Sequence, residues 1–471
     1  MSNRAQKIEN ARNVLEVVNP FDQKGIGSVP ITDAETVDKY LEVAHGLFIN
    51  RDNWLPAYER IDILKKTSKI MASRFDELAF QIANEGGKPL IDARVEVTRA
   101  IDGVELAAKE ISHLHGTEIP MDLTAAGSGR IAFTRREPIG VVVAVSAFNH
   151  PLNLIVHQVA PAIATGCPIL VKPADDTPLS CKAFVDILHE AGLPEEWCRF
   201  VACDIPTAEK MVTDSRVAFF SFIGSAKVGW MLRSKLAPGT RCALEHGGAA
   251  PVLVEQSAHV NEMIPELLKG GFYHSGQVCV SVQRIFVPKK MTEEIGTLLA
   301  DGAKKLTVGN AIEEKTECGP LIRPREIERV SEWIDEAKAS GAQILAGGEK
   351  LSQTTYAPTV LLNPSSDAKV SNMEIFGPVV CVYSYDDMDQ AIEQANSLPF
   401  AFQASVFTKN LDIATKAIQK FDATAVMVND HTAFRTDWMP FAGRRQSGYN
   451  TGGIGYTMHD MTQDKMAVIK L

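Results

Sequence analysis

Up to about residue 120, the apolar residues recur mostly at helical spacing, after a short extended lead. Residues 32–35 (Thr-Asp-Ala-Glu) have the form of a helix-capping box. Apolar positions from Val37 to Phe48 then follow at intervals of three and four. A second helical stretch begins at Ala57 and ends near residues 85–89, where two glycines and a proline stop it. This part of the chain is therefore predicted to be helical.

From residue 138 the pattern changes to short apolar runs that alternate with helical stretches. The run at 140–145 is rich in β-branched residues, which is typical of a strand buried on both faces. Further strands are expected at 169–171, 199–202, 217–222 and 242–244, and helices at 152–164, 179–191, 206–212 and 226–236. This alternation predicts a parallel, doubly wound sheet with right-handed crossovers.

A second alternating series begins at 252–254. Its helices are expected near 262–274, 292–305, 325–340 and 386–396, and its strands near 404–407 and 425–428. The series predicts a second α/β domain. Two short alternating segments, 129–136 and 465–471, lie outside both series, and we expect them to pair with a partner.

Composition and charge narrow the class of protein. A chain of 471 residues is expected to hold two or three domains. Its 45% hydrophobic and 23% charged residues are ordinary for a globular protein. The net charge of −10 argues against a nucleic-acid partner and against an anionic membrane surface.

No targeting, membrane or metal-binding pattern is visible. Residues 1–10 lack the apolar core of a secretory signal, and the stretch from Ile139 to Phe148 is far shorter than the ~20 residues that span a bilayer. The eight cysteines include no Cys-x-x-Cys pair and no zinc spacing. We therefore expect a reduced, cytoplasmic protein without a metal.

Cys279 is the strongest candidate for chemistry. It stands alone among glycine and small polar residues in 271–284, which is the setting of a nucleophile rather than of a disulfide. Glu245 is followed by His246 and two glycines. The two glycines indicate that the backbone beside this carboxylate must come close to another group. A thiolate that attacks a carbonyl and a carboxylate that activates water would make an oxidising acyl-transfer enzyme.

Three turns are candidates for binding a cofactor. Gly224 and Ser225 follow a strand and open a helix, where backbone N–H groups can meet a phosphate. Lys172 ends the second strand of the sheet, where ligands of such sheets bind. Glu374 and Phe376 lie in a Gly-Pro turn and could hold a ribose and a cofactor ring. The alternatives for these three turns are, in the same order, a tight turn without a ligand, a lysine in solvent and a turn with a hydrophobic anchor.

Asn149 closes the first strand of the sheet, where a side-chain amide can donate to a developing oxyanion. His150 and His157 follow it on an otherwise apolar helix face. Histidines in that setting are more often satisfied structural residues than bases, and we interpret both as structural.

In this order and at this spacing, the motifs resemble the aldehyde dehydrogenase superfamily over essentially the whole chain. The matching segments are Phe148-Asn149, Lys172-Pro173, 222–225 (Phe-Ile-Gly-Ser), 245–248 (Glu-His-Gly-Gly), 276–279 (Gly-Gln-Val-Cys), 374–378 (Glu-Ile-Phe-Gly-Pro) and 440–443 (Pro-Phe-Ala-Gly) with Ser447-Gly448. Seven motifs in family order are highly specific.

The resemblance implies an α/β protein of three parts. A Rossmann-like cofactor domain would comprise 1–119 and 138–246, and a second α/β domain, 247–440, would be catalytic. Small β oligomerisation strands would comprise 120–137 and 455–471. Members of the superfamily are usually dimers or tetramers, so a homodimer or homotetramer is expected.

The resemblance also implies roles. Cys279 would attack the aldehyde carbon as a thiolate, which requires a pKa below the ordinary ~8.5. Asn149 and the Cys279 N–H would stabilise the oxyanion, and Glu245 would activate the water that hydrolyses the thioester. The implied cofactor-binding residues are Phe148, Lys172, Ala174, Asp175, Gly224, Ser225, Glu374 and Phe376.

The cofactor would be NAD or NADP, with NAD preferred because a carboxylate at Asp175 accepts from a 2′-hydroxyl and repels a 2′-phosphate. Three residues depart from the family pattern. His246 replaces the usual leucine beside the base, and Ile223 replaces a threonine near the cofactor. Cys203 replaces a glycine and is expected to narrow the adenine pocket.

The substrate is expected to be a small polar or acidic aldehyde, because the motifs look like those of lactaldehyde and semialdehyde dehydrogenases. Arg284 and Arg444 are candidates for binding an anionic substrate tail, among four arginines that include Arg435 and Arg445. Domain or subunit contacts are the simpler interpretation of all four.

Three other functions stay open at this point. A CoA-acylating dehydrogenase would commonly lack the carboxylate of Glu245. A non-catalytic binding protein on the same fold would tend to lose Cys279, Glu245 or Asn149. A cysteine hydrolase would need a histidine partner, and His274 falls within the helical stretch expected to lead to Cys279.

Overall fold

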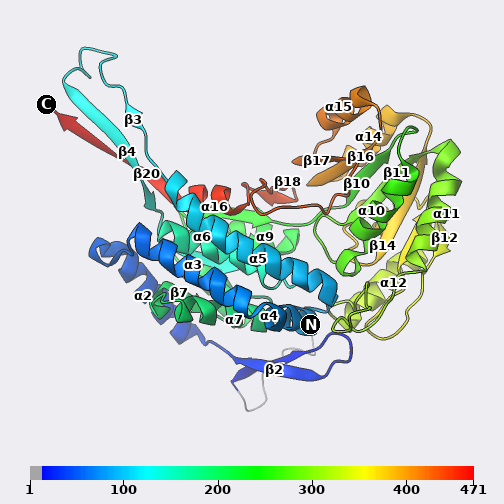
Figure 1. The fold of residues 1–471 in the computed structure, drawn as a ribbon, viewed down its shortest axis with the longest axis horizontal. Helices are drawn as coiled ribbons and strands as arrows, with labels where there is room; N and C mark the ends of the chain where they lie inside the picture. The colour runs from blue at the N-terminus through cyan, green and yellow to red at the C-terminus, as the bar shows by residue number, and fades with distance from the viewer. Residues whose placement is uncertain (1–12) are drawn as a thin grey trace.

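The structure is a computed structural model that describes residues 13–471. It consists of two α/β halves and a narrow β projection (Figure 1). The predicted lack of a secretory signal concerns residues 1–10, which lie outside the described residues. No described helix has the length and apolar character needed to cross a membrane.

The first half begins with a hairpin and four helices. The elements are β1 (Val14–Val18), β2 (Gly25–Pro30), α2 (Ala34–Ile49), α3 (Ala57–Ser73), α4 (Phe75–Gly86) and α5 (Leu90–Glu110). Asp33 caps α2 through the N–H of Thr36. The second helical stretch is divided at Arg74, and it ends where Gly87 takes a φ of 68° that glycine adopts without strain.

The sheet of the first half has the strand order β19-β9-β8-β5-β6-β7. Its strands are β5 (Val141–Val145), β6 (Ile169–Lys172), β7 (Cys198–Phe200), β8 (Val217–Ile223), β9 (Arg241–Glu245) and β19 (Gly448–Tyr449). The helices between them are α6 (Asn153–Thr165), α7 (Pro178–Glu190), α8 (Ile205–Thr213) and α9 (Ala226–Arg233). All strands but β19 are parallel, as the alternating pattern predicted.

The second half is a seven-stranded sheet of order β12-β13-β14-β11-β10-β16-β17. Its strands are β10 (Ala250–Val254), β11 (Val282–Pro288), β12 (Gln343–Ala346), β13 (Thr359–Leu362), β14 (Val379–Tyr385), β16 (Gln403–Phe407) and β17 (Ala425–Val428). Its helices are α10 (Val260–Phe272), α11 (Thr292–Ala303), α12 (Pro324–Ala339), α13 (Lys369–Asn372), α14 (Met388–Asn396) and α15 (Leu411–Lys420). The short strands β15 (Phe400–Ala401) and β18 (Arg444–Arg445) pair beside it.

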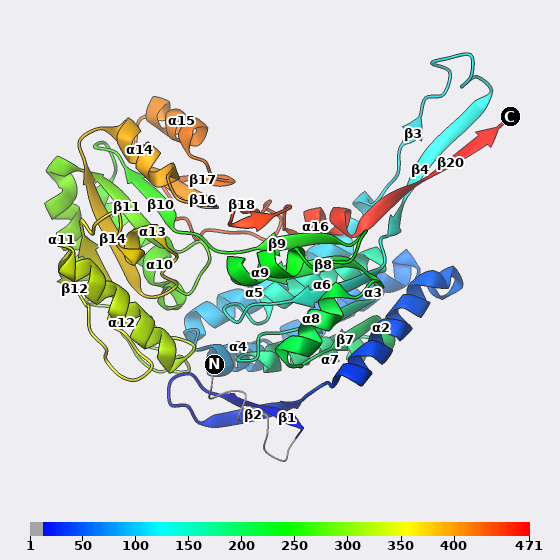
Figure 2. The ribbon, with the colours of Figure 1, turned by 180° about the vertical axis from the view of Figure 1, so that it is seen from behind.

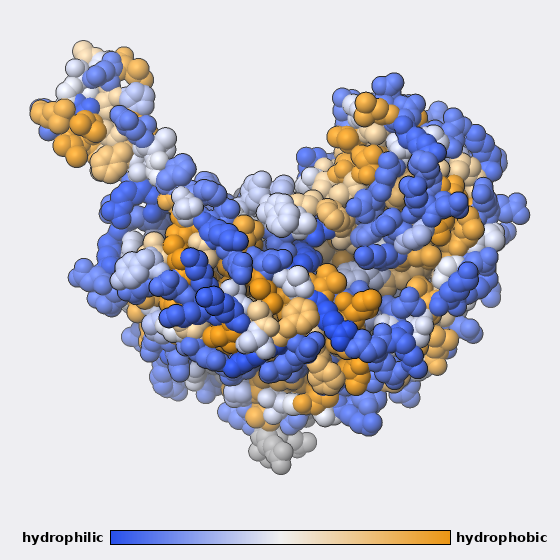
Figure 3. All heavy atoms as spheres, in the orientation of Figure 1, coloured by the Kyte–Doolittle hydropathy of each residue, from blue (hydrophilic) through white to orange (hydrophobic). Residues whose placement is uncertain are grey.

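The projection is a three-stranded antiparallel sheet that extends away from both halves (Figures 1 and 2). Its strands are β3 (Glu118–Ile119), β4 (Arg130–Pro138) and β20 (Thr462–Lys470), and the helix α16 (Ile454–Asp460) precedes β20. The two segments expected outside both series thus pair with each other, over nine residues. Apolar side chains gather on the projection (Figure 3), among them the exposed Phe133, Met466 and Val468.

A buried ion pair fixes the start of α6, the helix that follows Asn149. Lys88 and Glu96 have no exposed side-chain surface and are paired with each other. The other carboxylate oxygen of Glu96 accepts the N–H groups of Leu152 and Asn153, at 2.9 and 3.0 Å. The pair therefore ties α5 and the loop before it to the start of α6, close to Asn149.

Glu96→Gln is expected to lower the free energy of unfolding by about 3–5 kcal/mol, because it leaves a buried lysine without its counter-charge. Urea unfolding of the variant and the parent measures this. Glu190→Gln, which breaks the exposed pair with Arg74, serves as the control and should change the midpoint little. An equal effect of both substitutions would contradict the special role of the buried pair.

Candidate active site

A cavity of about 990 Å³ is lined by residues of both halves. On the side of the first half, its walls come from the carboxyl ends of β5, β6, β8 and β9, where ligands of such sheets bind. It brings together the predicted catalytic and cofactor-binding residues, which are Phe148, Asn149, Lys172, Ala174, Asp175, Gly224, Ser225, Glu245, Cys279, Glu374 and Phe376.

Cys279 lies between α10 and β11, on a loop that is held from inside. The side chain of Gln277 donates to the carbonyl of Pro320 at 3.2 Å and accepts the N–H of Ile322 at 3.0 Å. Seven of the eight cysteines are buried, and Cys279 alone is partly exposed. Burial raises the pKa of its thiol to about 12, and the carboxylate of Glu374 adds to this while Arg435 opposes it. The pKa below ~8.5 that the resemblance implies is therefore not found in this state, and Cys279 is a thiol at neutral pH.

Asn149 is buried and oriented toward the same loop. Its Nδ2 donates to the carbonyl of Gln277 at 2.9 Å. A side-chain amide carries two N–H groups, so one remains for a ligand in the cavity. The amide is therefore held by the loop of the cysteine.

Glu245 ends β9, and the C-terminal segment holds this strand end. Gly448 pairs with Glu245 in the sheet, and the N–H of His246 donates to the carbonyl of Ser447 at 3.0 Å. A Cβ at Gly452 would lie 2.0 Å from Oε1 of Glu245, so the carboxyl fills space that only a glycine leaves open. Burial raises the pKa of Glu245, and the charge of Arg435 opposes the rise.

The other end of the cavity has the form of a dinucleotide site. Gly224 and Ser225 form the turn between β8 and α9, where helix N–H groups favour a phosphate. Oε1 of Glu374 is buried without a hydrogen-bond partner, and burial raises the pKa of this carboxyl to about 8. An orphaned acceptor of this kind fits a ribose hydroxyl. Phe376 packs edge-on against Phe148 at 5.8 Å between ring centroids.

The two predicted substrate residues, Arg284 and Arg444, do not line this cavity, which corrects the prediction. The guanidinium of Arg284 is buried in β11 and donates to the carbonyls of Ala249, Gln394 and Ala395. Each of its three nitrogens therefore donates to a backbone carbonyl. Arg444 is exposed, pairs with Asp422 at 3.1 Å and does not line the cavity.

The arginine that lines the cavity beside Cys279 is Arg435. Its guanidinium carbon lies 3.5 Å from the centroid of the Phe441 ring, and its Nη2 is 3.4 Å from Nδ1 of His157. Its Nε is buried without a hydrogen-bond partner. The only sequence signal was an arginine two residues before an aspartate in a polar loop, which does not tell this arginine from its neighbours.

Asp437 organises the buried wall behind Arg435. It accepts from Arg99 at 2.8 Å, from Asn153 at 3.1 Å and from Nε2 of His157 at 2.7 Å. Burial raises the pKa of Asp437, but the bonds from His157 and Arg99 outweigh this and hold it well below its usual range. Burial lowers the pKa of His157 to about 4. This histidine is structural, as interpreted from the sequence.

His274 does not partner Cys279. The expected helix ends at Phe272, two residues earlier than the stretch predicted near 262–274, and His274 takes a left-handed φ of 47°. Both ring nitrogens of His274 are buried without a hydrogen-bond partner. Its ring packs against that of His150, at 6.5 Å between centroids. The histidine that a cysteine hydrolase needs is therefore not supplied by His274.

Two of the three departures shape the cofactor end. Nδ1 of His246 donates to the carbonyl of Gly224 at 2.8 Å, and its ring fills the space beside Gly229, where a Cβ would lie 2.1 Å from it. Ile223 lines the cavity. Cys203 is buried and does not line the cavity. The expectation that it narrows the adenine pocket is therefore corrected.

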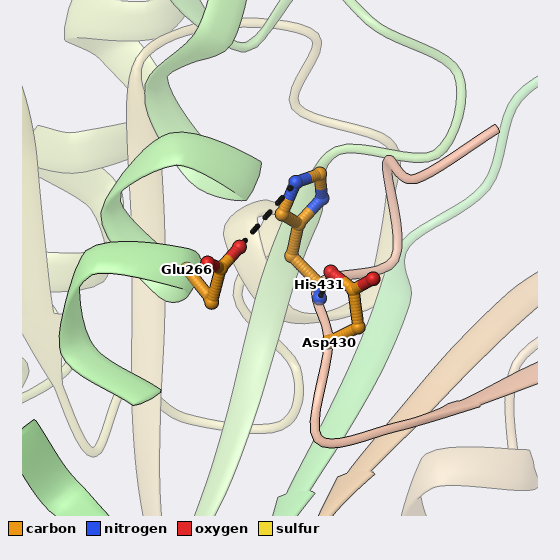
Figure 4. Close-up of side chains that lie close together, drawn as sticks. All are labelled: Glu266, Asp430 and His431. Carbon is orange, nitrogen blue, oxygen red and sulfur yellow. Dashed lines mark hydrogen bonds and ion pairs between the residues drawn. The ribbon is translucent and has the colours of Figure 1, made fainter. Parts of the chain in front are cut away.

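One group of side chains has the composition of a metal site: Glu266, Asp430 and His431 (Figure 4). Nδ1 of His431 accepts the N–H of Ala433 at 3.1 Å, so in the neutral ring Nε2 carries the proton. Nε2 faces Glu266 at 3.8 Å, and Asp430 accepts the backbone N–H of His431. A protonated Nε2 cannot coordinate a metal, and burial lowers the pKa of His431, so we interpret the group as a polar contact between a neutral histidine and Glu266.

Comparison with known proteins agrees with this geometry. The model of the aldehyde dehydrogenase family matches residues 7–467. A 3-sulfolactaldehyde dehydrogenase of Priestia aryabhattai is 34% identical over 464 residues, which are 98% of this chain and 96% of that protein.

Two solved structures are similar over nearly their whole length. The aldehyde dehydrogenase 21 of Physcomitrella patens, in complex with the reaction product succinate, has a TM-score of 0.93 at 34% identity, covering 98% of this chain and 96% of that one. The glyceraldehyde-3-phosphate dehydrogenase of Methanocaldococcus jannaschii, complexed with NADP, has a TM-score of 0.92 at 32% identity, covering 98% and 100%.

Proposed function

Since this chain belongs to the aldehyde dehydrogenase family, we propose that it is an NAD(P)-dependent enzyme that oxidises a small anionic aldehyde to its carboxylic acid. The observation that carries the substrate class is Arg435, a cavity-lining guanidinium whose buried Nε has no hydrogen-bond partner. A carboxylate, sulfonate or phosphate would supply the missing acceptor.

The proposed chemistry uses three groups of the cavity. Cys279 attacks the aldehyde carbon once its thiol has lost the proton, and Arg435 is the cation that favours this loss. The free N–H of Asn149 and the backbone N–H of Cys279 bind the oxyanion. The nicotinamide cofactor, when bound, would supply the acceptor for the hydride of the substrate carbon. Glu245 then activates the water that hydrolyses the thioester on Cys279.

The residues at the other end would hold the cofactor. The turn of Gly224 and Ser225 would bind the pyrophosphate, Lys172 and Asp175 would bind one ribose, and Glu374 would bind the other. Because Oε1 of Glu374 lacks a partner, a ribose hydroxyl would satisfy a buried acceptor.

The substrates and product named for the three similar proteins above support an anionic substrate, since 3-sulfolactaldehyde, succinate and glyceraldehyde 3-phosphate are all charged. Glu245 supports hydrolysis over transfer to CoA, because it lies in the cavity with Cys279. A requirement for free CoA in turnover would overturn this. If no aldehyde of a panel formed an acyl adduct on the protein, a non-catalytic role would be favoured instead.

Arg435→Leu is expected to lower kcat/KM for succinic semialdehyde about 100-fold, because it removes a charge-assisted contact worth ~2–3 kcal/mol. It should lower kcat/KM for uncharged butanal by a smaller factor, since only the effect of Arg435 on the Cys279 thiol is then lost. Steady-state kinetics on both aldehydes measures the difference. Arg444→Leu, outside the cavity, is the matched control. Equal losses on both aldehydes would exclude Arg435 as the anion site.

We further propose that the two halves are the cofactor and catalytic domains and that the projection joins subunits of a homodimer or homotetramer. The exposed apolar side chains on β4 and β20 support this, because such residues favour burial against a partner. Molecular mass in solution, measured by light scattering, tests it. We propose a cytoplasmic location, which the eight free cysteines support.

A further inference from the structure

An ion pair joins the two halves across the cofactor end of the cavity. Asp176 lies in the loop between β6 and α7, and Arg323 directly precedes α12 of the other half. Nε of Arg323 donates to Oδ1 of Asp176 at 2.9 Å, and Nη2 donates to Oδ2, so the pair is bidentate. Both residues line the cavity. Figures 1 and 2 both place one end of α12 beside the helices of the first half.

The pair lies next to the place proposed for one ribose. Phosphate binding is expected at the turn after β8, and β6 lies two strands away from β8 in the sheet, across β5. That separation is roughly 10 Å, since strands lie ~4.8 Å apart. In folds of this kind, an acidic residue near the strand end binds the ribose 2′-hydroxyl, and a nearby arginine accommodates a 2′-phosphate.

The cations at this end are each occupied by a carboxylate. Nζ of Lys172 lies 2.9 Å from Asp175, just as Arg323 is held by Asp176. Both arginines on the first turns of α12 donate to one carboxylate, Glu326, at 3.0 Å from Arg325 and 2.8 Å from Arg329. A 2′-phosphate would therefore have to displace a carboxylate before it gained a cation.

We propose that Asp176 is a specificity-determining residue for the cofactor. By holding Arg323, Asp176 keeps that guanidinium away from a 2′-phosphate, and the enzyme therefore binds NAD in preference to NADP. Release of Arg323 moves the preference toward NADP. The inference rests on the proposed function, because it places the adenosine ribose at the carboxyl end of β6.

The test measures, by calorimetry, the direct binding of two cofactor fragments to the intact protein. The fragments are adenosine 5′-monophosphate and adenosine 2′,5′-bisphosphate, which differ only in the 2′-phosphate. Asp176→Asn should raise the affinity for the bisphosphate about tenfold and leave that for the monophosphate within about twofold. In the double variant Asp176→Asn/Arg323→Gln, the gain should be lost.

The matched control is Glu314→Gln. It frees Arg94, which forms a bidentate pair with Glu314 that also links the two halves but does not line the cavity. This variant should bind both fragments as the parent does.

Two results would overturn the proposal. No gain in the Asp176→Asn variant would mean that Arg323 does not reach the 2′ position, and a gain that survives in the double variant would mean that the loss of a negative charge alone explains it. With either result, the proposed function stands and only this inference fails, provided that the parent binds the monophosphate and oxidises an aldehyde with NAD. If the parent binds neither fragment, both fail.

Discussion

Cys279→Ala is expected to lower aldehyde oxidation by at least about 10⁴-fold, because it removes the atom that forms the covalent bond to the substrate. The loss is measured from the absorbance of the reduced nicotinamide that forms with each aldehyde of a small panel. Binding of the cofactor should persist, since Cys279 is a single group among the many that line the cavity. Loss of cofactor binding along with turnover would point to a folding defect instead.

Labelling with iodoacetamide provides an independent measure of the same residue. Cys279 is the one partly exposed cysteine of eight, so the parent should take up one equivalent and the Cys279→Ala variant none. Burial and Glu374 raise the pKa of the thiol to about 12, and only the thiolate reacts. The labelling rate of the cofactor-free protein should therefore rise about tenfold per pH unit above neutrality. A rate that is already constant at neutral pH would contradict the raised pKa.

Glu245→Gln is expected to lower steady-state turnover by about 10²–10⁴-fold, because a glutamine cannot accept a proton from water. The first turnover should survive, since the attack of Cys279 and the first oxidation precede hydrolysis. Rapid mixing should then show a burst of about one equivalent of reduced nicotinamide per subunit, followed by a slow phase. Burial raises the pKa of Glu245, and the ionised form is the base. The rate of thioester hydrolysis in the parent should therefore rise with pH through a value above the ordinary pKa of glutamate.

Glu255→Gln is the control for this experiment. Glu255 is a buried carboxylate that accepts from Ser257 and Thr408, and it lies outside the cavity. Its first turnover and its steady-state rate should both match those of the parent. A Glu245→Gln variant that loses the burst would show that Glu245 acts before the thioester forms, as the base that deprotonates Cys279.

Local sequence was sufficient for the elements and for the residues at their ends. The parallel strands β5 to β9 follow from short apolar runs that alternate with helical periods, because these patterns are set by near neighbours in the chain. Asn149, Glu245 and the turn at Gly224 lie at strand ends, and the topology of a parallel sheet brings such ends to one edge. The first half and the side of the cavity that it provides could therefore be predicted.

Contacts between distant residues decided the rest. Arg284, Arg435 and Arg444 look alike in the sequence, but their partners lie far away in the chain, at Ala395, His157 and Asp422 in turn. Only the tertiary structure therefore shows that the guanidinium of Arg284 is used by backbone carbonyls and that Arg435 lines the cavity beside Cys279.

The sequence by itself determined the α/β architecture and the presence of a cysteine, a carboxylate and an amide suited to aldehyde oxidation. The tertiary structure alone decided which arginine can meet an anionic substrate and that Asp176 holds Arg323, 147 residues away, across the cavity. The physical reason is that secondary structure depends on side chains a few positions apart, whereas the partner of a charged group depends on how the two halves pack.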